Sequence, residues 1–175
     1  MAAAALQPWL DAALPGAVIR LPPGIYRGPA VISKPLTLDG QGKAIIDGAG
    51  RDTVLTIKAD KVTIRGLTLR GSGDSHDAID GAIMVAEGNG LLIENNVIED
   101  VLFGISLHRT TDSVIRHNRI RSRGASSADR GDGLRLWYSN DDLIEKNKVI
   151  DSRDMVAWYS HKNIFRDNLG RRSRY

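Results

Sequence analysis

The sequence predicts an all-β fold, a right-handed parallel β-helix, from three observations. Short, β-branched segments of alternating apolar residues recur along the chain, four of them end in Asn, and almost nothing between residues 17 and 169 has a helical apolar period. The four Asn residues are spaced 22, 29 and 21 residues apart. A coil of this length cannot bury its own apolar face, so neighbouring coils must stack into parallel sheets.

The repeat is clearest in four strand segments that end at Asn96, Asn118, Asn147 and Asn168. The interval of 29 contains an insertion, Arg121 to Asp132, whose Gly, Ser and Asp content predicts a loop. When this insertion is set aside, three coils have a second predicted strand at the same position of the repeat. These strands are Gly104 to His108, Gly133 to Trp137 and Met155 to Trp158. Earlier coils are longer, since the strands that begin at Leu36 and Val62 start 26 residues apart.

The recurring Asn residues are expected to form a structural ladder at a corner of the coil. An inward Asn side chain donates to and accepts from the Asn above and below it, and it pairs backbone groups that the bend leaves free. Asn96, Asn118, Asn147 and Asn168 are therefore interpreted as structural residues.

One domain accounts for residues 1–175, with a cap over residues 1–16 and coils over residues 17–175. The cap is expected to be a short helix in Leu6 to Leu14, where Leu6, Trp9, Leu10 and Leu14 recur at helical spacing. No comparable cap follows the last strand. The sequence therefore predicts either a truncated C-terminal end or an end covered by another molecule, and end-to-end association of two copies is one such arrangement.

Composition excludes several classes of protein. The chain has no Cys, so disulfides and thiolate metal sites are excluded, and no apolar run is long enough for a transmembrane helix. The net charge of +3 is small and no nucleic-acid-binding motif is present, so we expect neither nucleic-acid binding nor membrane insertion. The first five residues are not a complete signal peptide, and they fit either a signal remnant or helix-forming alanine.

Two segments resemble known families. Leu21 to Tyr26, followed by Lys34 to Gly40, resembles the first coil of the pectin-lyase-like superfamily, which implies the fold and little about function. Asp132 to Ser139 and Asp151 to Ser160 contain two tandem Trp-Tyr-Ser coil ends, and with Arg172 to Tyr175 they closely resemble the N-terminal part of the NosD family.

The NosD resemblance implies a periplasmic accessory protein and not an enzyme. Such a protein works with ABC transporter subunits, and with copper-chaperone or reductase proteins, in maturing the copper centres of nitrous oxide reductase. The later coils of that family are absent from this sequence.

The partner-binding candidates lie on the outer face of the second strand. Because Leu134 and Leu136 are expected to point inward, Arg135 and Trp137 point outward. The same register gives one outward column of His108, Trp137 and Trp158, and a next position with Tyr138 and Tyr159. This aromatic strip either binds a sugar or a protein partner, or it packs beneath the Arg121 to Asp132 loop.

Copper is the only cofactor that the sequence suggests, and it is expected to bind transiently. Met155, His161 and His108 are the tentative ligands because thioether and imidazole groups suit copper. No pair of ligands has the close spacing of a preformed metal motif.

Catalysis is the alternative interpretation. A polysaccharide lyase or epimerase of this fold needs an acid and a base, and His76, Asp77 and Asp80 form the densest such cluster, although its composition is also typical of a loop. Asp141 and Asp142 are expected at a turn with their side chains pointing apart. A third possibility is a carbohydrate-binding module without activity.

Overall fold

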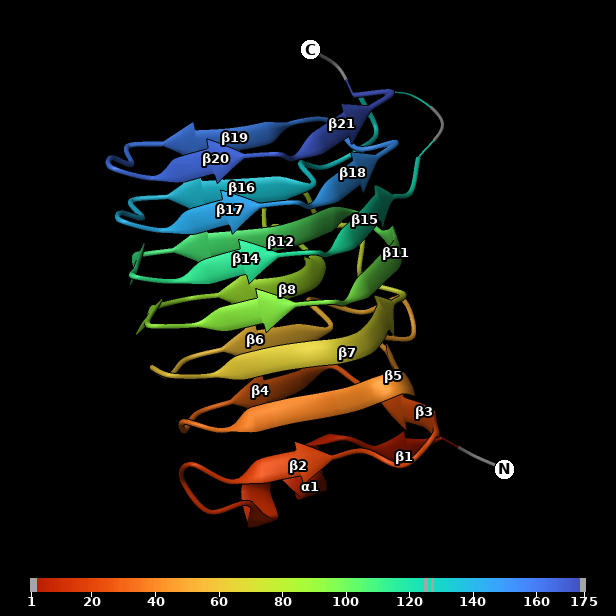
Figure 1. Ribbon diagram of the computed structural model, residues 1–175. Helices are drawn as coiled ribbons and strands as arrows, with labels where there is room; N and C mark the ends of the chain where they lie inside the picture. Colours follow the sequence, from red (N-terminus) through yellow and green to blue (C-terminus); the bar gives the residue numbers. More distant parts are fainter. Residues whose placement is uncertain (1–2, 125, 127, 174–175) are drawn as a thin grey trace.

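The computed structural model describes residues 3–124, 126 and 128–173, and these residues form coils stacked one above another (Figure 1). Strands of successive coils pair in parallel, and one short helix lies at the N-terminal end. The predicted parallel β-helix is confirmed. No helix of the described residues is long and apolar enough to cross a membrane.

One wall of the coils is a six-stranded sheet that carries the aromatic residues. Its order is β19-β16-β12-β8-β6-β4, so each strand pairs with its counterpart in the coils above and below. The strands are β4 (Ala30–Ile32), β6 (Leu55–Ile57), β8 (Gly81–Val85), β12 (Phe103–His108), β16 (Leu134–Trp137) and β19 (Met155–Trp158).

The other walls belong to one bent, 13-stranded sheet. The long strand β7 spans the bend, because its first residues pair with β10 and its last residues pair with β11. The first face holds β2 (Val18–Arg20), β5 (Thr37–Asp47), β7 (Thr63–Arg70), β10 (Leu92–Glu94), β14 (Val114–Arg116), β17 (Leu143–Glu145) and β20 (Ile164–Arg166). The second face holds β1 (Ala4–Ala5), β3 (Gly24–Arg27), β11 (Val97–Val101), β15 (Arg119–Ser122), β18 (Lys148–Ile150) and β21 (Leu169–Arg171).

The predicted Asn ladder occupies the bend between these two faces. Asn96, Asn118 and Asn147 each donate from Nδ2 to Oδ1 of the next Asn at 3.0 Å, and the last bond reaches Asn168. Each Nδ2 also donates to a backbone carbonyl of an earlier coil, as Asn118 does to Ile93 at 2.9 Å. The residue before each Asn has a positive φ, which makes the bend and turns the Asn side chain inward.

The core is a set of apolar stacks inside the coils. Ile64, Ile93, Ile115 and Ile144 pair in register between neighbouring coils, and all four are fully buried. Burial of such apolar surface drives the stacking, since a single coil leaves it exposed. In the last coil, Phe165 continues this stack and is 40% exposed.

The N-terminal end is closed by α1 (Gln7–Ala12) and by β1, which pairs with β3 (Figure 1). The helix is shorter than the predicted segment and only Leu6 and Leu10 are buried in the core. Leu14 lies beyond the helix and is 77% exposed, so its inclusion in the cap was wrong. Ala4 and Ala5 form a strand, which excludes the helix-forming role considered for them.

A polar turn follows the six-stranded sheet and contains β9 (Gly88–Asn89) and β13 (Thr110–Thr111). In this turn the backbone N–H of Thr110 donates to Ser139 Oγ, and that of Ser139 donates to Ser160 Oγ. Ser139 and Ser160 are the final residues of the two Trp-Tyr-Ser motifs. Their role in this structure is to join successive turns.

Candidate functional site: an aromatic strip on the six-stranded sheet

The two tyrosines of the Trp-Tyr-Ser motifs stack on the outside of the coils. The rings of Tyr138 and Tyr159 are 5.0 Å apart and nearly parallel, with an angle of 12°. Both residues have φ near 50°, which marks the start of the turn after β16 and β19 and directs the rings to the surface. They are 50% and 66% exposed. We call Trp137, Tyr138, Trp158 and Tyr159 the aromatic strip.

Trp137 and Trp158 follow the predicted register, since His108 pairs with Trp137 and Trp137 pairs with Trp158. Trp137 meets Tyr159 edge-on at 5.1 Å and lies under the guanidinium of Arg135, also at 5.1 Å. Trp158 is 53% exposed. Contacts with Tyr159 and Arg135 therefore hold the ring of Trp137 in place, whereas much of the ring of Trp158 is open to solvent.

The described residues of the insertion contact segments away from the strip. Gly131 donates to the carbonyl of Leu102, just before β12, and Arg123 donates to the carbonyls of Ser72 and Gly73, which follow β7. The exposure of Trp158 and the tyrosines agrees with this placement. Of the two interpretations of the strip, packing beneath the loop is excluded for the described residues.

An ion pair that the sequence did not reveal borders the strip. Arg153 donates to both carboxylate oxygens of Asp132, at 2.9 and 3.3 Å, and this contact raises the pKa of Arg153. Arg153 also lies 5.9 Å from the ring of Phe103. The two charged residues are 21 residues apart, one coil, so the repeat length was the signal that pointed to them. The sequence analysis placed Asp132 at the end of the insertion and at the start of a NosD-like segment, and it assigned no ion pair to this residue.

Polar atoms without partners lie beneath the strip. Among the described residues, Ser106 Oγ, His108 Nε2 and Arg135 Nε are buried and make no hydrogen bond. Ser106 and Arg135 pair across β12 and β16, and His108 is on the same outer face of β12. Burial lowers the pKa of His108, and the positive charges of Arg135 and Arg109 lower it further. Both causes favour the neutral form of the His108 imidazole.

A hollow of about 520 Å³ runs across β16 and β19 beside these residues. Its walls combine aromatic rings with alternating charges, and the lining residues are Asp132, Arg135, Trp137, Arg153, Asp154, Val156, Trp158 and Tyr159. The hollow brings together four of the partner-binding candidates, namely Arg135, Trp137, Trp158 and Tyr159, whereas His108 and Tyr138 do not line it.

The three tentative copper ligands are not brought together. Met155 pairs with the buried Leu134 and packs inward against the core, whereas His108 faces outward two coils below the level of Trp158. His161 lies in the turn beyond β19, where its backbone N–H donates to Asn140. The described residues also contain no group of three or more His, Asp or Glu side chains arranged to hold a metal ion. Their geometry does not form a preformed copper site.

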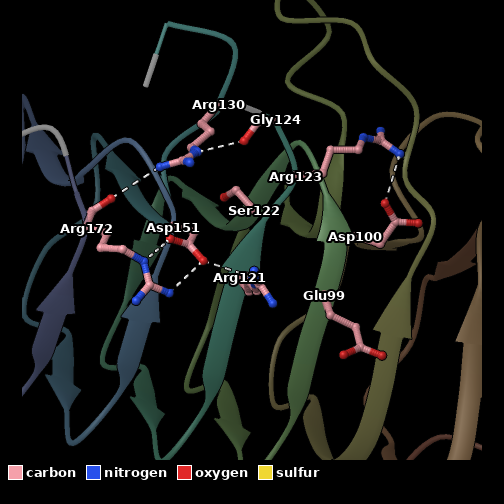
Figure 2. A pocket seen from close by; sticks show the side chains of 9 residues that line it. All are labelled: Glu99, Asp100, Arg121, Ser122, Arg123, Gly124, Arg130, Asp151 and Arg172. Carbon is pink, nitrogen blue, oxygen red and sulfur yellow. Dashed lines mark hydrogen bonds and ion pairs between the residues drawn. The ribbon is translucent and has the colours of Figure 1, made fainter. Parts of the chain in front are cut away.

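A second hollow, of about 670 Å³, lies beside the insertion (Figure 2). Asp151 is paired with Arg121 from the coil below, at 3.0 Å, and with Arg172 from the coil above, at 2.9 Å. These contacts, above all the hydrogen bond from Arg172, lower the pKa of Asp151 to about 2. On the other side, Arg123 lies 2.6 Å from Asp74 and 3.7 Å from Asp100. The arginines of this hollow thus link coils to each other.

The comparisons with known proteins agree with this architecture. Residues 52–171 match the family model described as the right handed beta helix region. The chain belongs to the right-handed β-helix family. The match covers the strands of the aromatic strip as well as the Asn ladder.

Within this family the β-helix is similar to NosD proteins. It is 34% identical over 133 residues to the protein named "Probable ABC transporter binding protein NosD" of Pseudomonas aeruginosa, and 31% identical over 137 residues to the protein of the same name from Stutzerimonas stutzeri. These alignments cover 75% and 77% of this β-helix chain, but 31% of each relative. The matched part therefore spans about a third of the length of these relatives.

The relatives are named as binding proteins and not as enzymes. In this β-helix the alternative catalytic cluster forms a surface turn. Asp80 is buried and accepts a hydrogen bond from the Ser75 backbone at 3.0 Å, while His76 and Asp77 are exposed. His76 packs edge-on against Phe103 at 5.6 Å. Asp141 and Asp142 diverge as predicted, since Asp142 is buried and Asp141 is exposed.

Proposed function

We propose that this β-helix is an accessory protein in the maturation of the copper centres of nitrous oxide reductase. It is a periplasmic docking scaffold that works with an ABC transporter and receives copper-chaperone or reductase proteins on its aromatic strip. The single observation that carries the proposal is the open aromatic strip on a chain similar to NosD, whose relatives are named for ABC transporter binding.

The strip has the properties of a protein-binding surface. Tyr and Trp are enriched among the residues that contribute most to binding, because they supply large contact areas with few rotatable bonds. Tyr138 and Tyr159 are already ordered by stacking on one another, and Trp137 is ordered by Arg135 and Tyr159. A partner therefore binds here with little loss of side-chain entropy.

Copper enters this proposal as cargo that crosses the surface between partners. The exposed His161 is the most accessible of the tentative ligands, whereas Met155 faces the core. A complete site for transfer then requires donors from the partner protein. This arrangement suits transient contact, since a transferred ion must also leave.

The docking role is tested with the purified cognate ABC transporter, by interferometry against the immobilised β-helix. Trp158→Ala combined with Tyr159→Ala is expected to weaken binding by about tenfold or more, because both rings are exposed and line the hollow. Trp9→Ala is the matched control, since Trp9 is 41% exposed at the opposite end of the molecule. Equal transporter affinities of the wild type, the double variant and Trp9→Ala would contradict the proposal.

The copper role is tested by anaerobic Cu(I) titration against a competing chelator. Because Met155, His161 and His108 do not converge, the β-helix alone is expected to take up no stoichiometric copper. Stoichiometric uptake that is lost in Met155→Ala combined with His161→Ala would make the chain a metal carrier instead of a docking scaffold.

A further inference from the structure

The chain is electrically polarised along the stack. Residues 1–112 contain 10 of the 24 Lys and Arg residues and 13 of the 21 Asp and Glu residues. Residues 113–175 therefore contain 14 of the basic residues and 8 of the acidic ones. The aromatic strip lies in the basic part. A net positive potential attracts acidic partners to this part of the molecule and repels basic ones.

Arg135 is the cation at the strip that is least well paired. Its side chain is only 18% exposed, and its ion pair is with Asp132 at 3.8 Å. Asp132 is already bound through both oxygens by Arg153. In the other ion pairs of the described residues each arginine has a carboxylate within 3.0 Å. A largely buried cation without a close counterion gains free energy when an anion arrives.

The surroundings of Arg135 favour a hydrogen-bond acceptor. Arg135 Nε makes no hydrogen bond with the described residues, and neither does Ser106 Oγ, which is 1% exposed and directly beneath it. Because both of these atoms are buried, an incoming carboxylate is expected to be bound by the two Nη groups of the Arg135 guanidinium. The lowered pKa of His108, to which the charges of Arg135 and Arg109 contribute, reflects the same positive field. That field disfavours a cation at this position.

We propose that Arg135 receives the carboxylate of an acidic segment of a partner protein, and that the aromatic strip packs on the side chains next to that carboxylate. This inference rests on the proposed docking role and specifies its chemistry. The guanidinium and a carboxylate match in shape and form two parallel hydrogen bonds. Trp158 and Tyr159 line the same hollow and provide the apolar contact beside the ion pair.

The hollow also limits how many carboxylates it accepts. Asp132 and Asp154 line it together with Arg135 and Arg153, so its two arginines are balanced by two acidic residues. A single carboxylate at Arg135, followed by apolar or aromatic side chains, suits this pattern better than a dense polyanion.

The test is a titration of the full chain with an N-acetylated, C-terminally amidated peptide that carries one Glu followed by Leu and Phe, and intrinsic Trp fluorescence at low salt follows the binding. Trp137 reports on the site because its ring lies 5.1 Å from the Arg135 guanidinium. Arg135→Gln is expected to weaken binding by about tenfold, in line with the loss of a charge-assisted hydrogen-bonded pair. Arg119→Gln is the matched control, since it removes the same charge from an exposed position on β15.

Arg135→Lys keeps the charge without the planar donor pair and is expected to bind with intermediate affinity. Equal losses in Arg135→Gln and Arg119→Gln, or no binding by the wild type, would overturn the carboxylate site. Acetate at the same carboxylate concentration is expected to bind much more weakly, and equal affinity would overturn the assignment to a polypeptide. The transporter measurement uses no peptide, so failure here is distinguishable from failure of the docking role.

Discussion

The Asn ladder and the aromatic strip lie on the same coils but differ in how fully their polar groups are bonded. Along the ladder each inner amide both donates and accepts, as Asn118 does with Asn96 and Asn147 at 3.0 Å. Beneath the strip, Ser106 Oγ, His108 Nε2 and Arg135 Nε are buried without a partner among the described residues.

The difference separates positions that build the stack from positions that serve a partner. In the ladder the same residue type recurs in four successive coils, because each of them meets the same bonding problem. In the outward column of the strip the residue type changes from His108 to Trp, and the Trp is present only in two coils, at Trp137 and Trp158. A solenoid repeats what its fold requires, so residues that break the repeat are the better candidates for function.

The largest expected effect is on the ladder. Asn118→Leu leaves the buried backbone N–H of Asn96 without its acceptor, and it removes one of the two acceptors of Asn96 Nδ2 and the side-chain donor to the Ile93 carbonyl. At about 1–3 kcal/mol for each such group, the free energy of unfolding is expected to fall by roughly 3–5 kcal/mol. Chemical denaturation measures this loss.

Asn168→Leu is the control for that experiment. Asn168 is half-buried in the last described coil, where water replaces lost hydrogen bonds, and its loss is expected to cost about 1 kcal/mol. Equal costs at Asn118 and Asn168 would contradict the view that burial makes the ladder essential.

The strip is expected to show the opposite behaviour. Tyr138→Ala combined with Tyr159→Ala removes a stacked pair worth about 0.5–1.5 kcal/mol, so stability changes little. Transporter binding is expected to fall by about tenfold, because the two exposed rings make up half of the strip. A large loss of stability with unchanged binding would reverse the comparison.

Most of the fold was predictable because its cause is periodic. The spacing of Asn96, Asn118, Asn147 and Asn168 gave the coil length, and the alternation in Gly133 to Trp137 gave the correct inward and outward faces. The N-terminal end was less predictable. Leu14 matched the helical spacing, but the helix ends at Ala12, and so a short cap depends on tertiary contacts more than on its own pattern.

The candidate site was predictable in its aromatic residues and not in its charges. The strip follows from the register alone, whereas the lack of a close partner for Arg135 depends on Asp132 being bound by Arg153. Such competition between side chains is decided by distances of about an ångström. The interval of one coil between Asp132 and Arg153 was visible in the sequence. It did not show whether Arg135 or Arg153 would be left without a close carboxylate.

A smaller effect is expected at the second hollow, where Asp151 is paired with two arginines. The pKa of Asp151 is lowered to about 2 by Arg172 and Arg121, compared with about 3.9 for an unfolded chain. A lowered carboxyl pKa stabilises the folded state above about pH 4, and this contribution disappears as the pH falls toward 2.

Asp151→Asn should therefore lower the melting temperature at pH 6, and the difference from the wild type should vanish near pH 2. Asp167→Asn, at an exposed position in the last coil, should show no such pH dependence. A constant difference across this range would mean that Asp151 acts through packing and not through its charge.

The smallest and most local effect concerns His108. Burial and the charges of Arg135 and Arg109 lower its pKa, so the folded state favours the neutral imidazole and loses stability as the pH falls below about 6.5. Arg135→Gln removes one of the two charges and should raise the His108 pKa, as followed by NMR titration of the imidazole. Burial remains the larger cause, so the pKa should stay below its ordinary value. Arg119→Gln should leave the His108 pKa unchanged. If both variants shift this pKa equally, the positive potential at His108 comes from the whole basic half of the molecule and not from Arg135 at the strip.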